Sequence, residues 1–174
     1  MSLHSSKDHP LGSQIPKRTA SDTMGTLPIP KGAYYSAQTA RSLMNFPFSS
    51  SVMPFGLVLS LCAIKKCCVK YNIQTTKLLK EDIWIPLLQA IEEVKDGRMG
   101  RDMFPLSIYQ TGSGTQTNMN VNEVLANRAE VILRNGGKEI PEGRVLECLD
   151  VSSKDRIIRK LLHLGTTVTP LLIV

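Results

Sequence analysis

The apolar periodicity of residues 121–132 constrains the fold most. Apolar side chains recur there at helical spacing, at Val121, Val124, Leu125, Ala129 and Ile132. This period is typical of an amphipathic helix. Directly before it, residues 110–117 carry hydroxyl and amide side chains and two glycines. We therefore predict a glycine-containing loop that leads into a helix.

The predicted loop has the composition of a small anion site. Gly112 and Gly114 permit a positive φ, which lets backbone N–H groups converge on one point. The N-terminus of the following helix would add unpaired N–H groups and a favourable dipole. No Lys follows the second glycine, so the pattern of a nucleotide phosphate loop is missing. Neutral donors suit a carboxylate, and the expected lining residues are Ser113, Thr115, Thr117 and Asn118.

An ordinary helix cap is the alternative interpretation of this loop. A Thr or Asn would then bond the first-turn amides, and the glycines would form a turn. Capping needs only one or two such residues, whereas asparagines are poor helix formers. Four of them fall in this region, namely Asn118, Asn120, Asn122 and Asn127. A polar binding site accounts better for the whole group.

The rest of the pattern predicts a mainly helical domain. We expect an irregular N-terminal segment with one short hairpin near residues 26–29, and then three helices. Pro54 and Pro86 fit first-turn positions of the first two helices. Gly97 would end the second helix and the glycine pair at 136–137 the third. Residues 104–109 are predicted to form a short extended entry to the glycine loop.

Residues 110–128 resemble the first signature block of the fumarase and aspartase superfamily, in its class II fumarase version. The resemblance also includes residues 18–42, with the run Ala-Gln-Thr-Ala-Arg-Ser at 37–42, and several shorter matches up to residue 137. Aspartase, or aspartate ammonia-lyase, shares the architecture and is the competing assignment. The blocks at 41–46 and 109–117 are more similar to fumarase.

The resemblance implies reversible hydration of fumarate to malate. It places Ser113, Gly114 and Thr115, with Asn118, among the groups that bind the dicarboxylate substrate. It implies no cofactor and no metal, and a homotetramer in full-length members. No catalytic residue is expected in this chain, because the family's His-containing second block and its Ser, Lys and Asn loop find no match, and His4, His9 and His163 lie in no matching context.

The resemblance further implies that this chain is only the first of three domains and lacks the central helical bundle. We predict a mobile tail over residues 1–17, a fumarase-like N-terminal domain over 18–145, and an aberrant tail unrelated to the family over 146–174. A frameshift, a mis-spliced transcript or a faulty gene model would explain the last segment. A non-catalytic short isoform that binds dicarboxylate or full-length subunits, and an unfolded remnant, are the alternatives.

Composition adds constraints on partners and location. The net charge of +6 suits an anionic substrate, and 5% aromatic residues with scattered Lys and Arg do not favour nucleic acid. The longest apolar run, residues 57–64, is too short to span a bilayer. The four cysteines form no CxxC pair, so we expect buried free thiols and no zinc. A cytoplasmic location is predicted, with mitochondria as the alternative.

Overall fold

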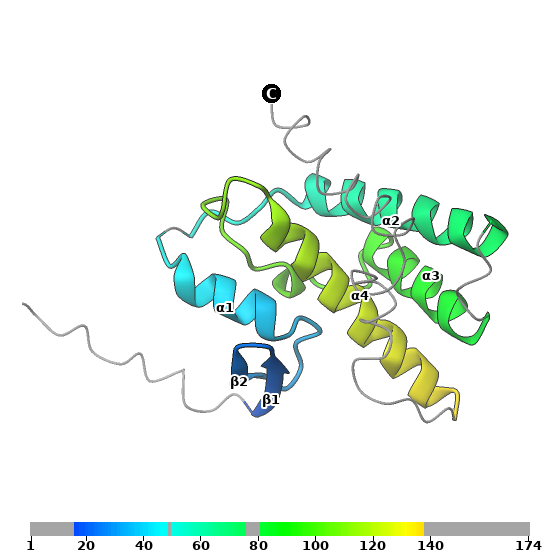
Figure 1. The fold of residues 1–174 in the computed structure, drawn as a ribbon, viewed down its shortest axis with the longest axis horizontal. Coiled ribbons are helices and arrows are strands. Elements are labelled where there is room, and N and C mark those ends of the chain that lie inside the picture. Colours follow the sequence, from blue (N-terminus) through cyan, green and yellow to red (C-terminus); the bar gives the residue numbers. More distant parts are fainter. Residues whose placement is uncertain (1–15, 49, 76–80, 138–174) are drawn as a thin grey trace, which may run out of the picture.

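The computed structural model describes residues 16–48, 50–75 and 81–137. Over these residues the chain forms one hairpin, four α-helices and one short 3-10 turn (Figure 1). The predicted tails at 1–17 and 146–174 lie almost wholly outside the described residues. The fold is mainly helical, as expected.

The hairpin pairs strand β1, Lys17–Asp22, with strand β2, Gly25–Pro30, in antiparallel register. Asp22 lies opposite Gly25, so only two residues make the turn, and Gly25 has a φ of 109° that favours glycine. Leu27 and Ile29 are buried while Pro28 between them is exposed, which is the alternation of a strand with one covered face. The hairpin predicted near residues 26–29 is confirmed.

Helix α1, Ala37–Asn45, follows the hairpin. The prediction of an irregular N-terminal segment followed by three helices is therefore wrong here. A small satellite cluster of buried side chains joins α1 to the hairpin, formed by Ala20, Leu27, Ile29 and Ala37. The Arg41 side chain bonds both carboxylate oxygens of Asp22, at 2.7 and 2.8 Å, and fixes α1 to the end of β1.

Helices α2, Phe55–Thr75, and α3, Glu81–Lys95, supply much of the main core. Pro54 directly precedes α2, close to its expected place. Pro86 is inside α3 rather than in its first turn, so that prediction is wrong. The helix begins earlier because Ile83 enters the apolar core, where it is 9% exposed. Gly97, with a φ of 71°, follows the end of α3 as predicted.

Helix α4, Thr115–Asn135, is the central element. Figure 1 shows it running between α1 on one side and α2 and α3 on the other. Val121, Val124 and Leu125 are fully buried in the main core, together with side chains of α2 and α3. Gly136 and Gly137 follow its last turn, as the sequence predicted. Because α4 is enclosed on several sides, its N-terminal end is held in a fixed place.

The 3-10 turn η1, Arg101–Met103, and an extended stretch connect α3 to the glycine loop. Ser107 pairs with Val52 in an isolated antiparallel bridge, and the amide of Met53 donates to the carbonyl of Leu106 at 2.8 Å. The entry to the loop is thus tied to the segment before α2, and the predicted extended conformation is confirmed at this bridge.

Candidate functional site

The glycine loop begins with a clamp made by Gln110. Its side-chain Nε2 donates to the carbonyl of Ser107 at 2.8 Å. Its Oε1 accepts from the backbone N–H of Thr117 at 3.1 Å and from the Thr117 hydroxyl at 2.9 Å. Gln110 therefore caps the first turn of α4 from outside the helix. Thr117, expected to line the anion site, is 2% exposed and serves this clamp instead.

Gly114 is the N-cap of α4 and has a φ of 67° and a ψ of 5°, which is the left-handed region. Its N–H donates to the carbonyl of Thr111 at 3.1 Å and closes a tight turn. Gly112 has no positive φ, so the expectation that both glycines would adopt it holds only for Gly114. One left-handed residue is sufficient to turn the chain into the helix.

Ser113 and Thr115 flank this glycine and are exposed. Their hydroxyl oxygens lie 3.1 Å apart, with Ser113 donating to Thr115. Neither side chain caps the helix, because Gly114 holds the N-cap position and Gln110 takes the Thr117 amide. Both hydroxyls consequently face solvent at the positive end of a helix of 21 residues.

Two first-turn amides remain at this end. The N–H groups of Thr115 and Gln116 find no acceptor in the described part of the chain, as is usual for the first residues of a helix. Together with the two hydroxyls they form a set of neutral donors around the α4 N-terminus. Such a set is chemically suited to a carboxylate.

Asn118 lies one turn further along α4 and is 7% exposed. Its Oδ1 accepts from Nζ of Lys65, on α2, at 2.7 Å. Lys65 is itself only 4% exposed, and no local pattern in the sequence marks it as part of a site. Of the four predicted site residues, Ser113, Gly114 and Thr115 are thus consecutive at the loop, and Asn118 stands behind them.

The other asparagines of α4 make different contacts. Asn120 donates to the carbonyl of Met103 at 3.0 Å, and Asn127 donates to the carbonyl of Tyr34 at 2.6 Å. They tie α4 to neighbouring irregular segments. Asn122 is 3% exposed, and its Oδ1 is the one buried side-chain polar atom without a partner among the described residues. The interpretation of all four asparagines as one polar site is therefore wrong for Asn120 and Asn127.

Glu123 provides a cap that sequence reasoning missed. It is 1% exposed on α4, and its carboxylate meets the N-terminus of α1. One oxygen accepts from the amide of Gln38 at 2.8 Å. The other accepts from the amides of Ser36 and Thr39 and from the Thr39 hydroxyl, at 2.9, 3.2 and 2.6 Å. Ser36, the N-cap of α1, makes no side-chain cap of its own.

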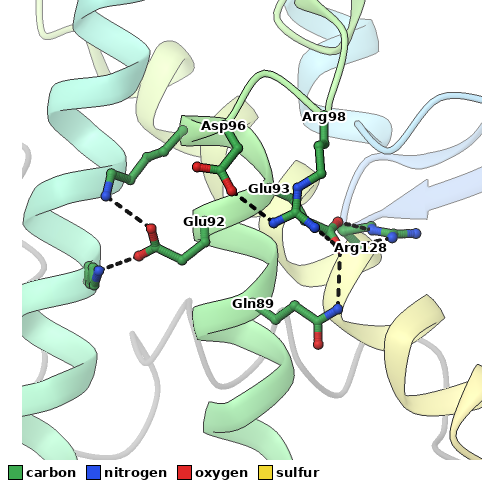
Figure 2. Close-up of polar contacts among 8 residues, drawn as sticks. Gln89, Glu92, Glu93, Asp96, Arg98 and Arg128 are labelled. Carbon is green, nitrogen blue, oxygen red and sulfur yellow. Dashed lines mark hydrogen bonds and ion pairs between the residues drawn. The ribbon is translucent and has the colours of Figure 1, made fainter.

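A polar network on the opposite part of α4 joins it to α3 (Figure 2). Arg128 pairs with the carboxylate of Glu93 through two nitrogens, and a third donates to the Tyr34 hydroxyl at 3.0 Å. The Arg128 side chain, by hydrogen bonding, lowers the pKa of Glu93, and the same contact raises the pKa of Arg128. Gln89 also donates to Glu93, at 3.3 Å. This network stabilises the helix pair and lies apart from the glycine loop.

The cysteines divide by burial. Cys62 on α2 is fully buried, as expected, and desolvation raises the pKa of its thiol to about 12. Cys67 is exposed, so the expectation of buried thiols is wrong there. Cys148 lies outside the described residues. Within those residues no group of His, Cys, Asp and Glu side chains is arranged to hold a metal ion.

Comparison with known proteins decides the family. The model of the family described as "Lyase" matches residues 25–157, which include the loop and all of α4. The chain belongs to this lyase family. It is 46% identical over 116 residues to the class II fumarate hydratase of Myxococcus xanthus and 46% identical over 123 residues to fumarate hydratase class II 1 of Pseudomonas aeruginosa.

A solved structure agrees with this membership. The class II fumarase of Schistosoma mansoni superposes with a TM-score of 0.68 at 36% identity, over 86% of this chain and 32% of that one. The chain therefore has the fold of the N-terminal part of the fumarase and aspartase superfamily, as the sequence indicated. The chain spans 24% of the Myxococcus relative and 26% of the Pseudomonas relative.

No helix among the described residues of this chain is both long and apolar enough to cross a membrane. His4, His9 and His163 lie outside those residues. The described part of the chain thus offers neutral hydrogen-bond donors at the glycine loop, and no imidazole stands beside them.

Proposed function

We propose that this chain supplies the dicarboxylate-binding N-terminal part of a fumarate hydratase, which interconverts fumarate and malate. The observation that carries the proposal is the pair of exposed hydroxyls of Ser113 and Thr115 around the left-handed Gly114 at the start of α4. The fumarate hydratase names of the relatives support the choice of substrate.

The proposed chemistry assigns these residues to charge stabilisation. In the hydration of fumarate, negative charge develops on the carboxylate next to the carbon that gains or loses a proton. Fixed neutral donors stabilise that charge without reorganising. Ser113 and Thr115 would donate hydroxyl protons, and the amide of Thr115 would add a third donor. The general base and the general acid would have to come from segments other than residues 16–137.

We further propose that the site is completed by other subunits in a homotetramer of the whole protein. Four large apolar side chains near the loop are exposed, namely Phe48, Val52, Ile108 and Tyr109. They belong to the two segments that the bridge between Val52 and Ser107 joins. Exposed apolar side chains of this kind support a subunit interface. The 174-residue chain alone is therefore expected to be inactive. The cytoplasmic location and the absence of nucleic-acid binding stay predictions.

A chimera tests the proposal. Residues 25–137 of this chain replace the matching segment of the Myxococcus relative, and hydration of fumarate is followed by loss of its ultraviolet absorbance. We expect an active chimera and an inactive 174-residue chain. Aspartate is assayed in parallel, since release of ammonia from it without any turnover of fumarate would favour the aspartase alternative.

Variants of the chimera test whether Ser113 and Thr115 bind fumarate. Thr115→Val and Ser113→Ala should each raise KM for fumarate about tenfold, which corresponds to the loss of a hydrogen bond to a charged group. Thr26→Val, an exposed threonine of β2, is the matched control and should leave KM unchanged. A folded tetrameric chimera without activity, or equal KM values in all three variants, would contradict the proposal.

A further inference from the structure

The contact between Lys65 and Asn118 joins two buried polar side chains directly behind the glycine loop. Lys65 comes from α2 and Asn118 from the second turn of α4, and Nζ lies 2.7 Å from Oδ1. An ammonium group only donates hydrogen bonds, so the oxygen of the Asn118 amide must face Lys65. The contact therefore fixes which way the amide points.

The Asn118 nitrogen is turned away from Lys65 by the same geometry. Nδ2 finds no acceptor in the part of the chain that the structure describes, and it is not among the buried unpartnered atoms there. It thus keeps access to solvent. Asn118 follows Thr115 by three residues, a spacing that places two side chains next to each other on a helix surface.

We infer that Lys65 is a positioning residue that holds the Asn118 amide with its nitrogen towards the carboxylate site of Ser113 and Thr115. This inference rests on the proposed function. In the orientation held by Lys65, Asn118 presents a donor to a bound carboxylate. In the flipped orientation it would present its oxygen to the anion, and the two would repel each other. Lys65 acts through Asn118 and does not itself touch the substrate.

Burial gives independent support. Moving a lysine ammonium out of water costs free energy that a methionine of similar length would not require. Lys65 is nevertheless 4% exposed on a helix whose neighbouring buried positions are Leu61, Cys62 and Val69. A buried lysine at the position that contacts Asn118 is therefore consistent with a requirement for the hydrogen bond between the two side chains.

The test is a titration of the full 174-residue chain, labelled with ¹⁵N, with sodium fumarate. Sodium chloride at equal ionic strength is the control for unspecific anion effects. Backbone signals of the loop and the side-chain NH₂ signal of Asn118 report binding. The variants are Lys65→Met, Asn118→Ala and the double substitution, with Lys70→Met as the matched control, because Lys70 is an exposed lysine of the same helix.

We expect Lys65→Met to raise Kd for fumarate about tenfold and Lys70→Met to leave it unchanged. The double variant should bind no more weakly than Asn118→Ala, because Lys65 contributes through that amide alone. Lys65→Arg, which keeps a donor at this position, should stay within about threefold of the unmodified chain. It serves as the readout if Lys65→Met does not fold.

Four results would overturn the inference. Fumarate binding that is unchanged in Lys65→Met, or losses that add fully in the double variant, would exclude action through Asn118 while leaving the proposed function intact. A folded Lys65→Arg chain that binds as weakly as Asn118→Ala would do the same. If the unmodified chain shows no saturable shift with fumarate, the role of Lys65 in fumarate binding by this chain is refuted, whereas the proposed function is decided by the activity of the chimera.

Discussion

The carboxylate of Glu123 is predicted to control the stability of α1, and Glu123→Gln tests this directly. The glutamine oxygen can take the place of the carboxylate oxygen that accepts from Ser36 and Thr39. Its NH₂ group then faces the amide of Gln38, donor against donor. Three hydrogen bonds then have a neutral acceptor in place of a charged one, and the fourth hydrogen bond is lost.

The magnitude follows from these four contacts. A hydrogen bond to a charged group is worth about 1 kcal/mol more than a neutral one, so three weakened bonds cost about 3 kcal/mol. The lost bond to the amide of Gln38 adds about 1 kcal/mol. Relaxation of the α1 N-terminus recovers part of the total. We expect the free energy of opening of α1 to fall by about 3 kcal/mol.

Two measurements follow α1 and the core separately. Hydrogen exchange at the amides of residues 37–45 reports the opening of α1. Urea unfolding followed by the fluorescence of Trp84, the single tryptophan, reports the core against which it packs. Glu92→Gln is the control. That carboxylate is paired with Lys66 and Lys95 but is partly exposed, so its loss should cost less than about 1 kcal/mol.

A specific result would refute this reasoning. If Glu123→Gln changes neither the exchange of α1 nor the Trp84 transition by more than the Glu92→Gln control does, the four contacts do not hold the helix. The cap from α4 would then be geometrically present and energetically unimportant.

Three further predictions concern other parts of the chain. Because Arg128 lowers the pKa of Glu93, their pair stabilises the folded chain above about pH 4.3, and this stabilisation is lost as pH falls through the folded pKa. Urea unfolding of Glu93→Gln should therefore differ from that of the unmodified chain at neutral pH, and the difference should shrink as pH falls through the lowered pKa of Glu93. Gly114→Ala, at a φ of 67°, should lower the free energy of unfolding by about 1 kcal/mol in the same assay and weaken fumarate binding. Peptide mapping after brief alkylation should find Cys67 modified and Cys62 unmodified, and equal labelling would contradict their difference in burial.

The elements that sequence could predict are those whose ends are encoded locally. Gly97 follows α3 and the glycine pair at 136–137 follows α4, and Gly97 and Gly137 adopt the left-handed region in which helices commonly end. The apolar periodicity of α4 and the covered face of β2 are also local patterns. Ser113, Gly114 and Thr115 could be predicted to lie together because the loop that presents them is continuous in sequence.

The features that sequence missed depend on distant partners. Helix α1 has few apolar residues and no side-chain cap from Ser36, and the carboxylate that caps it lies 84 residues beyond Thr39. The lysine that orients Asn118 lies 53 residues earlier, on another helix. No local pattern distinguishes Asn118 from Asn120, although one meets Lys65 and the other a backbone carbonyl. Such assignments need the packing of α4 against its neighbours.

The satellite cluster of the hairpin and α1 has a consequence for synthesis of the protein. Its first residues leave the ribosome long before the carboxylate that caps α1, which follows Thr39 by 84 residues. At about 5–20 residues per second, this interval lasts roughly 4 to 17 seconds. During that time Leu27 and Ile29 have only each other and a few alanines to cover them. We expect this nascent segment to be a binding site for chaperones until α4 has been made.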